Sequence, residues 1–452
     1  MGINNIEKWT LGHYLLNSWV SFWHNRIFYR KVILHQTHHI PRQGHVIFTP
    51  IHQNALMDAM AVVCNLKSQP VFLARSDIFR KKAVAGILYF LKILPVYRIR
   101  DGFDALKKND AIFVKTIDVI KNKRGLVVLP EGNHDGHRRL RPLKKGFARI
   151  AFQTEEANHY ELDLKIVPVG LDYSDYQTSR STLLINFGEP LPVSSYYDLY
   201  REAPVKAINE IKDDLSQRLK TLMVHIENEE FYSFFDELRE IGKYVMQEKL
   251  GLGSIQQPHK LAADQALIRL LEERVESDHQ EVKEQHDRFL VLRKNLRRFN
   301  LSYDVLHNEG SHPVLLILKS LIILLTTPMF LYGMVNNILP YRISYRMGSR
   351  VKDPAFRSSF KFLLSLLLFP FFNVLQALIV KIFFSWTVTG LYFLSVPLSG
   401  VMAYYWIRSF RKTRMNWTYK IQKRSSNRHF KNMLDHYETL IRWLRSLGAE
   451  NN

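Results

Sequence analysis

The sequence predicts an α/β fold, a sheet flanked by helices, with an N-terminal interfacial helix, a helical insert and a C-terminal helical membrane domain. Three observations carry this prediction. Between residues 46 and 187, short β-rich runs alternate with helical stretches, as in α/β domains. The first 32 residues are rich in aromatic and basic side chains. Three later segments approach the roughly twenty apolar residues that a membrane span requires.

Composition narrows the class of protein. The 452 residues include 63 Lys and Arg against 42 Asp and Glu, a formal net charge of +21. That charge favours a polyanionic partner, and long apolar segments without a nucleic-acid-binding motif favour an anionic phospholipid membrane over nucleic acid. The single cysteine, Cys64, excludes an internal disulfide and fits a reducing cytosol. We expect no secretory signal, because residues 6–32 lack a small-residue cleavage site.

Residues 1–34 are expected to form an interfacial membrane helix. Tryptophan-rich apolar faces with basic flanks prefer the headgroup region of a bilayer. The alternative is a helix packed on the soluble domain. The side chains that recur with a helical period are Trp9, Tyr14, Leu15, Trp19, Phe22, Trp23, Ile27 and Phe28.

Residues 35–200 are expected to form the catalytic domain. Sheets of this kind place their sites at the carboxyl ends of strands, although the pattern leaves open whether the sheet is fully parallel. Strands are expected at 46–49, 70–74, 94–98, 126–129, 164–170 and 182–187, and helices from about residue 54 and at 79–93, 103–122 and 142–158.

The first chemical motif follows the strand at 46–49. His52 and Asp58 are separated by five residues, and a histidine with a carboxylate in the next helix is the usual arrangement of a base and its orienting group. Six steps of 100° would leave the two side chains well apart on one helix. His52 should therefore lie in the loop, with Asp58 reaching back from the first turns of the helix.

Three further blocks follow in order, Leu94 to Arg98, Val128 to Gly132 and Ile166 to Gly170. Together with the His52–Asp58 pair, they resemble the glycerolipid acyltransferases, the family of glycerol-3-phosphate and 1-acylglycerol-3-phosphate acyltransferases. The resemblance covers roughly residues 35 to 190 and implies an acyltransferase-type mixed sheet. The common family motif has four residues between His and Asp, and the five found here resemble the longer form of fungal glycerol-3-phosphate enzymes.

The resemblance implies roles for individual residues. His52 would take the proton from the acceptor hydroxyl, and Asp58 would orient His52. Arg98 matches the family's phosphate ligand, and Arg100 is a second candidate. A guanidinium suits this role because its rigid fork binds phosphate oxygens.

The later blocks are expected to bind substrate. Glu131 would bind acceptor hydroxyls, and Gly132 would allow a turn and close backbone approach. The family usually places Ser or Thr after this glycine, whereas Asn133 and then His134 follow it here. Lys144 matches a lysine that is frequent in family members. The fourth block carries no titratable group and is expected to help to line an acyl-chain pocket.

The remainder of the chain is expected to be helical and membrane-associated. The first hydrophobic segment should be re-entrant, because the catalytic domain before it and the basic loop 342–361 after it should both face the cytoplasm. Pro328 near its middle can break the helix. The alternative is a single tilted span with the basic loop outside. Basic residues flank the segments and should face the cytoplasm. The predicted parts are a charged helical region at 201–311, hydrophobic segments at 313–340, 362–380 and 386–407 within 312–407, and a basic cytoplasmic tail at 408–452.

These features predict an integral membrane acyltransferase with its catalytic domain on the cytoplasmic face of a bacterial inner membrane or an equivalent membrane. The donor would be acyl-CoA or acyl carrier protein, and the acceptor glycerol-3-phosphate or lysophosphatidic acid. Acylation of another lipid, such as an amino-acid lipid, and a non-catalytic lipid-binding scaffold are the alternatives. We expect no cofactor and no metal, and His35, His38 and His39 are expected to be loop residues, because no Cys, Asp or Glu completes a set with them.

Overall fold

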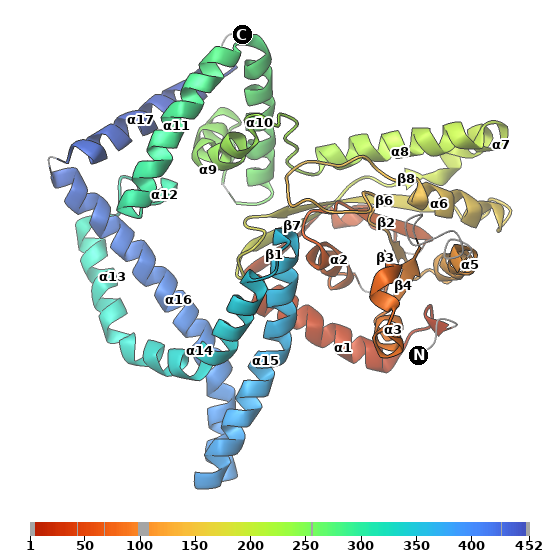
Figure 1. Ribbon diagram of the computed structural model, residues 1–452, viewed down its shortest axis with the longest axis horizontal. Coiled ribbons are helices and arrows are strands. Elements are labelled where there is room, and N and C mark those ends of the chain that lie inside the picture. The colour runs from red at the N-terminus through yellow and green to blue at the C-terminus, as the bar shows by residue number, and fades with distance from the viewer. Residues whose placement is uncertain are drawn as a thin grey trace. The chain divides into compact units, whose positions relative to one another are not determined.

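The computed structural model describes residues 5–42, 44–66, 68–97, 108–254, 256–425 and 427–448. The chain forms two compact units. The first contains Met1–His225 and the short segment Gly348–Phe362. The second contains Ile226–Met347 and Leu363–Asn452. Figure 1 shows a sheet with flanking helices in the first unit and long helices in the second.

A mixed sheet organises the first unit. Its strand order in the described residues is β1-β7-β6-β2-β5-β3-β4, and β8 pairs with β6. Neighbours from β6 to β4 are parallel, whereas β7 is antiparallel to β6 and carries β1 parallel to itself. The strands are β1 Lys31–His35, β2 Val46–Pro50, β3 Val71–Arg75, β4 Ile93–Val96, β5 Leu126–Val127, β6 Lys165–Tyr173, β7 Thr182–Phe187 and β8 Leu191–Pro192.

Apolar runs in the central strands make the core. All five residues of β2 are buried, as expected for a strand covered on both faces. Among the covering helices, α8 packs against β6 and α2 against β2. The helices of this unit are α1 Leu11–Phe22, the π-helix η2 Trp23–Phe28, α2 Leu56–Val63, α3 Lys82–Phe90, α5 Lys108–Lys121, α6 Gly146–Glu156, α7 Tyr197–Glu202 and α8 Pro204–Thr221, with 3-10 turns η3 Thr37–His39, η4 Ser76–Phe79 and η6 Val193–Tyr196.

The N-terminal region departs from the single helix predicted within residues 1–34. The helix ends at Phe28, and the chain continues as strand β1. His35 therefore lies in a strand, not in a loop, and its ring nitrogen pairs with the amide oxygen of Asn186 on β7 at 2.9 Å. The expected aromatic face is present on α1, where Trp19 and Phe22 are 43% and 50% exposed. Phe28 on the following turn is buried against Phe362.

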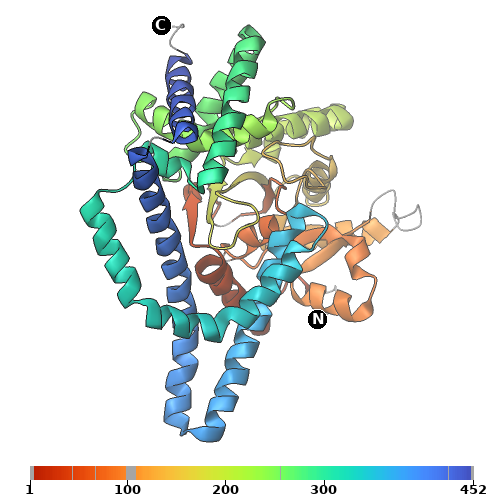
Figure 2. The same ribbon diagram turned by 60° about the vertical axis from the view of Figure 1, so that its left-hand side comes forward.

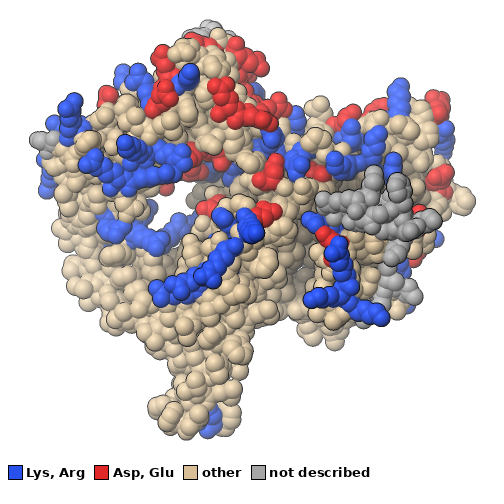
Figure 3. Space-filling model, viewed as in Figure 1, with Lys and Arg blue, Asp and Glu red and all other residues tan. Residues whose placement is uncertain are grey.

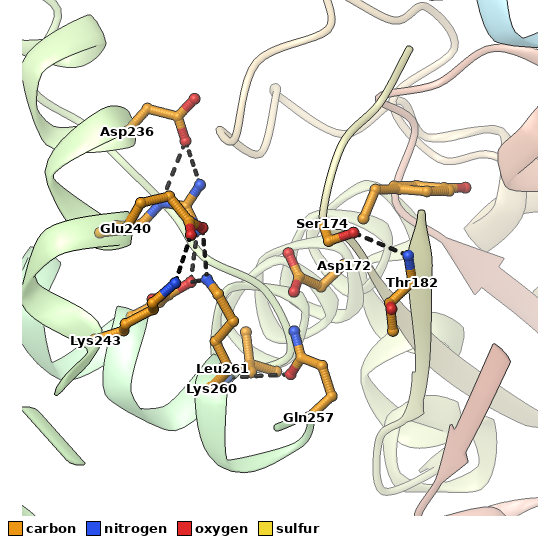
Figure 4. A network of polar contacts seen from close by, with 12 residues as sticks. Asp172, Ser174, Thr182, Asp236, Glu240, Lys243, Gln257, Lys260 and Leu261 are labelled. Carbon is orange, nitrogen blue, oxygen red and sulfur yellow. Dashed lines mark hydrogen bonds and ion pairs between the residues drawn. The ribbon is translucent and has the colours of Figure 1, made fainter. Parts of the chain in front are cut away.

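The fourth block, Ile166 to Gly170, lies inside β6 rather than at its end. β6 runs on to Tyr173, because its last residues pair with β7. The backbone N–H of Thr182 donates to Ser174 Oγ at 2.9 Å where the β6–β7 connection closes (Figure 4). Close packing requires glycine at position 170, because a Cβ there would lie 2.2 Å from the carbonyl oxygen of Leu222.

Amphipathic helices build one part of the second unit. Leu238, Ile241 and Leu267 are buried between α9 and α10. Figure 4 shows Glu240 on α9 held between two lysines, with nitrogen–oxygen distances of 3.0 Å to Lys243 and 3.3 Å to Lys260. The helices are α9 Tyr232–Lys249, α10 His259–Ser277, α11 His279–Phe299, α12 Tyr303–His307 and α17 Arg428–Ser446.

Long apolar helices complete the second unit. Helices α15 Pro354–Phe383 and α16 Trp386–Arg424 are each long and apolar enough to cross a membrane, and Figures 1 and 2 show them converging toward the turn that joins them. Helices α13 Pro313–Leu325 and α14 Thr327–Ser349 form a pair bent by 53° and pass the same test only together. The bend lies at the predicted Thr326–Pro328 break. Figure 3 shows that the region around the turn between α15 and α16, at the bottom of the view, carries almost no charged side chains on the face displayed.

Candidate active site

The carboxyl ends of neighbouring strands bring the first and third sequence blocks together. β2 and β5 are adjacent and parallel, so the residues that follow them emerge at one edge of the sheet. His52 follows β2, and Glu131 follows β5. The site is therefore assembled by strand order, although the two residues are far apart in sequence.

His52 and Asp58 form a dyad. His52 lies in the loop and Asp58 in the first turn of α2, as the spacing predicted. The Nδ1 atom of His52 is 3.1 Å from Oδ2 of Asp58, whose side chain is fully buried. The same oxygen accepts the backbone N–H groups of Gln53 at 2.8 Å and Asn54 at 2.6 Å. These bonds hold the carboxylate in place beneath the imidazole.

Tyr173 at the end of β6 supports the dyad from behind. Its hydroxyl donates to Oδ1 of Asp58 at 2.8 Å, so both carboxylate oxygens are engaged. Burial, with the nearby charge of Asp58, raises the pKa of Tyr173 well above its usual value, which keeps the hydroxyl a donor. A buried ion pair lies next to it: Arg138 donates to Asp172 at 2.5 Å and to the carbonyl oxygen of Tyr173 at 2.6 Å.

Glu131 holds the loop that carries His52. Its Oε1 accepts the backbone N–H of His52 at 2.6 Å, and its Oε2 accepts that of Arg141 at 3.0 Å. The side chain is buried, and burial raises its pKa to about 8 against the opposing effect of these two bonds. The carboxyl group thus positions the base. Its predicted contact with an acceptor hydroxyl stays a prediction.

A second histidine lies against the first. The ring centroids of His52 and His134 are 5.1 Å apart in an edge-on arrangement. Nε2 of His134 is 3.1 Å from Oδ2 of Asp353, and its ring meets Phe356 at 4.8 Å between centroids. Asp353 and Phe356 belong to the segment 348–362, which is part of this unit. Ser358 in the same segment donates a hydrogen bond to the carbonyl oxygen of Tyr176.

Of the other residues predicted to bind substrate, the structure describes Gly132 and Lys144. Gly132 has φ of +68°, which only glycine adopts readily, and the exposed Lys144 passes beside it, with Cγ 3.4 Å from where a Cβ would stand. Arg98 and Arg100 lie outside the described residues. The described chain continues past the end of β4 to Tyr97, whose backbone N–H donates to Asn109 Oδ1 at 3.0 Å. No cluster of three or more metal-ligating side chains occurs in the described ranges.

Residues 31–172 match the acyltransferase family, and that range contains His52, Asp58, Glu131 and His134. This part of the chain is an acyltransferase domain. Its mixed sheet and flanking helices agree with the fold that the sequence predicts.

Two proteins similar to this chain are named as acyltransferases of glycerol-3-phosphate or of its 1-acyl derivative. Glycerol-3-phosphate O-acyltransferase 1 of Saccharomyces cerevisiae is 26% identical over 118 residues, which cover 25% of this chain and 15% of the yeast protein. The 1-acyl-sn-glycerol-3-phosphate acyltransferase of Borreliella burgdorferi is 24% identical over 203 residues, 43% of this chain and 74% of that one. The match to the yeast relative thus spans less than a sixth of its length.

Solved structures are also similar to this chain. One of them is the 1-acyl-sn-glycerophosphate acyltransferase of Thermotoga maritima, which is 17% identical with a TM-score of 0.32. The similarity covers 46% of this chain and 81% of that one.

Sequence reasoning missed three residues around the dyad. Tyr173 lies three residues beyond the fourth block and ends the same strand, so a prediction that carried the strand past Gly170 would have included it. His134 was noticed only as a departure from the family pattern. Asp353 lies 219 residues from its partner His134, and no local signal connects them.

Proposed function

We propose that this protein transfers an acyl group from a thioester, acyl-CoA or acyl carrier protein, to a hydroxyl of glycerol-3-phosphate or lysophosphatidic acid. The observation that carries the proposal is the dyad of His52 with a fully buried Asp58 at the end of a strand in an acyltransferase domain. The names of the similar proteins support the choice of glycerolipid acceptors.

The geometry suits general-base catalysis. Because Asp58 faces Nδ1 of His52, the free Nε2 is the atom that takes the proton from the acceptor hydroxyl. The hydroxyl oxygen then bonds to the thioester carbonyl carbon. When the tetrahedral intermediate collapses, the carbon–sulfur bond breaks and the thiolate receives the proton from His52. Asp58 stabilises the imidazolium that exists between these two proton transfers.

Acceptor recognition is proposed to depend on phosphate. Arg98, at the position of the family's phosphate ligand, would bind the phosphate group of the acceptor, with Arg100 as second candidate. Both follow β4, whose carboxyl end lies at the same edge of the sheet as the ends of β2 and β5. Lys144 beside Gly132 would add positive charge to this edge.

We further propose that the protein is embedded in a membrane, with the acyltransferase domain facing the cytoplasm. Two helices are long and apolar enough to cross a bilayer. The exposed aromatic face of α1 suits the headgroup region. Basic residues lie between the hydrophobic segments 313–340 and 362–380 and again after segment 386–407, as is usual on the cytoplasmic side of a membrane.

A thiol-release assay tests the proposal. The purified protein is offered acyl-CoA or acylated carrier protein with a panel of acceptors, which includes glycerol-3-phosphate, lysophosphatidic acid and an amino-acid lipid. The His52→Ala variant should lose at least about a hundredfold in turnover, the size of a general-base effect, while its elution profile stays unchanged. Turnover within a few-fold of wild type would place the base elsewhere.

A further inference from the structure

A cavity in the second unit lies beside the bend between α13 and α14. It has a volume of about 420 Å³, within the range of roughly 300–1,000 Å³ typical of small-molecule sites. Its walls come from α13, the bend, α14 and α16, and most of the lining side chains are apolar or aromatic. Phe330 and Trp406 stack in its lining with ring centroids 4.1 Å apart.

A smaller, polar cavity of about 80 Å³ adjoins the first. The two share Lys319, Ser409 and Thr413, and the smaller one adds Lys412 and Asn416. Lys319 is the charged residue that interrupts the first apolar segment, and charges at such positions are costly unless they serve a purpose. Within the described residues, neither Lys319 nor Lys412 has a carboxylate within 4 Å.

The lining of the two cavities changes from apolar to polar in the same direction in space along α13 and α16. On α16, Met402 and Trp406 line the apolar cavity, whereas Lys412 and Asn416 line the polar one. α13 runs the opposite way: the indole N–H of Trp406 donates to the carbonyl oxygen of Ile323 at 3.0 Å, and Ser311 N–H donates to Asn416 at 2.7 Å. The apolar ends of both helices therefore coincide, and so do the polar ends.

We propose that these joined cavities bind an anionic phospholipid. Its phosphate group lies between the ammonium groups of Lys319 and Lys412, with Ser409 and Thr413 as further hydrogen-bond donors. One acyl chain fills the apolar cavity along Met402, Trp406 and Phe330. The arrangement matches an amphiphile in both charge and polarity, and it does not depend on the acyl-transfer reaction proposed for the other unit.

Binding of a fluorescent phosphatidic acid to the full-length protein in neutral detergent tests this site. The measurement uses anisotropy and a His52→Ala background, so that no turnover alters the probe. We expect the Lys319→Ala/Lys412→Ala variant to raise the dissociation constant at least about tenfold, the loss of roughly one charge-assisted hydrogen bond. Met402→Trp, which fills the apolar cavity without changing charge, should weaken binding as well.

Arg414→Ala is the matched control, because this exposed arginine lies on the same helix but lines neither cavity. It should bind the probe like the parent protein. Unlabelled phosphatidic acid should displace the probe, and phosphatidylcholine and inorganic phosphate should not. Equal competition by phosphatidylcholine, full displacement by inorganic phosphate, or unchanged binding in the double lysine variant would each overturn the proposal.

Discussion

Two arginines are expected to decide which acceptors the enzyme accepts. Arg98→Ala should raise the Michaelis constant for a phosphate-bearing acceptor about tenfold or more and leave that for the thioester nearly fixed, because the lost contact is with phosphate in ground and transition states alike. Steady-state kinetics with each substrate varied in turn measures both constants. Arg100→Ala serves as the comparison, and equal effects on both substrates would mean that Arg98 is structural.

The buried carboxyl group of Glu131 is expected to make the stability of the folded protein depend on pH. Its pKa rises from 4.5 to about 8 on folding, so between these values the folded state binds the proton more tightly than the unfolded state. Stability should therefore fall as the pH rises through this window. Glu131→Gln removes the titrating group and should flatten the dependence of the thermal midpoint between pH 5 and pH 8. An unchanged slope in the variant would contradict this account.

At the scale of elements, the segment before and at the start of α15 is expected to act through His134. Asp353→Asn should lower turnover roughly tenfold, since a charge-assisted hydrogen bond is lost and the ring beside His52 is no longer held. In a His134→Ala background the same substitution should have no further effect, which a double-mutant cycle measures.

Two phenylalanines of α15 provide a control for this segment. Phe356 packs on His134, whereas Phe360 is 45% exposed. Phe356→Ala should behave like Asp353→Asn, and Phe360→Ala should keep wild-type turnover. A loss of the same size in both would mean that the segment acts only through general stability.

The sequence predicts some elements better than others, for physical reasons. Apolar runs such as those of β2 and β7 are short, β-rich and bounded by turns, so their positions agree with prediction to within a residue. β1 was missed because it directly follows an aromatic helix and is itself an edge strand with partly exposed residues. The direction of β7 has no local signature, since strand pairing is decided by contacts distant in sequence.

The active site likewise combines a locally predictable part with a part that depends on contacts distant in sequence. His52 and Asp58 are six positions apart, so their pairing was predictable from this short motif together with the three blocks that follow it in order. The support that Tyr173 and Glu131 give them depends on strands β5 and β6 lying on either side of β2. That order is a property of the whole sheet.

At the scale of the whole molecule, the path through the membrane is open to a direct test. Re-entry at the 53° bend would keep residues 346–352 on the cytoplasmic side. Arg346→Cys and Lys352→Cys, both at exposed positions, should resist an impermeant thiol reagent in intact cells and react after permeabilisation. Labelling in intact cells would contradict re-entry.

The design of this experiment depends on burial. Ser344 and Ser358, which follow the same segment, are 5% and 2% exposed and therefore unsuitable for labelling. Phe384→Cys, at the exposed turn between α15 and α16, should react in intact cells and serves as the positive control. Cys64 is replaced by Ala in every variant, although burial already raises its pKa to about 12 and makes it unreactive.

The first unit is discontinuous along the chain, and this has a consequence for how the protein is made. The segment Gly348–Phe362 joins Met1–His225 only after all of residues 226–347 have left the ribosome. A nascent chain that stops earlier contains His52 and Asp58 but lacks Asp353 and Phe356, the partners of His134. The contacts of His134 are thus completed only after the first apolar helices have been synthesised, which ties the assembly of this site to the synthesis of the chain's own hydrophobic segments.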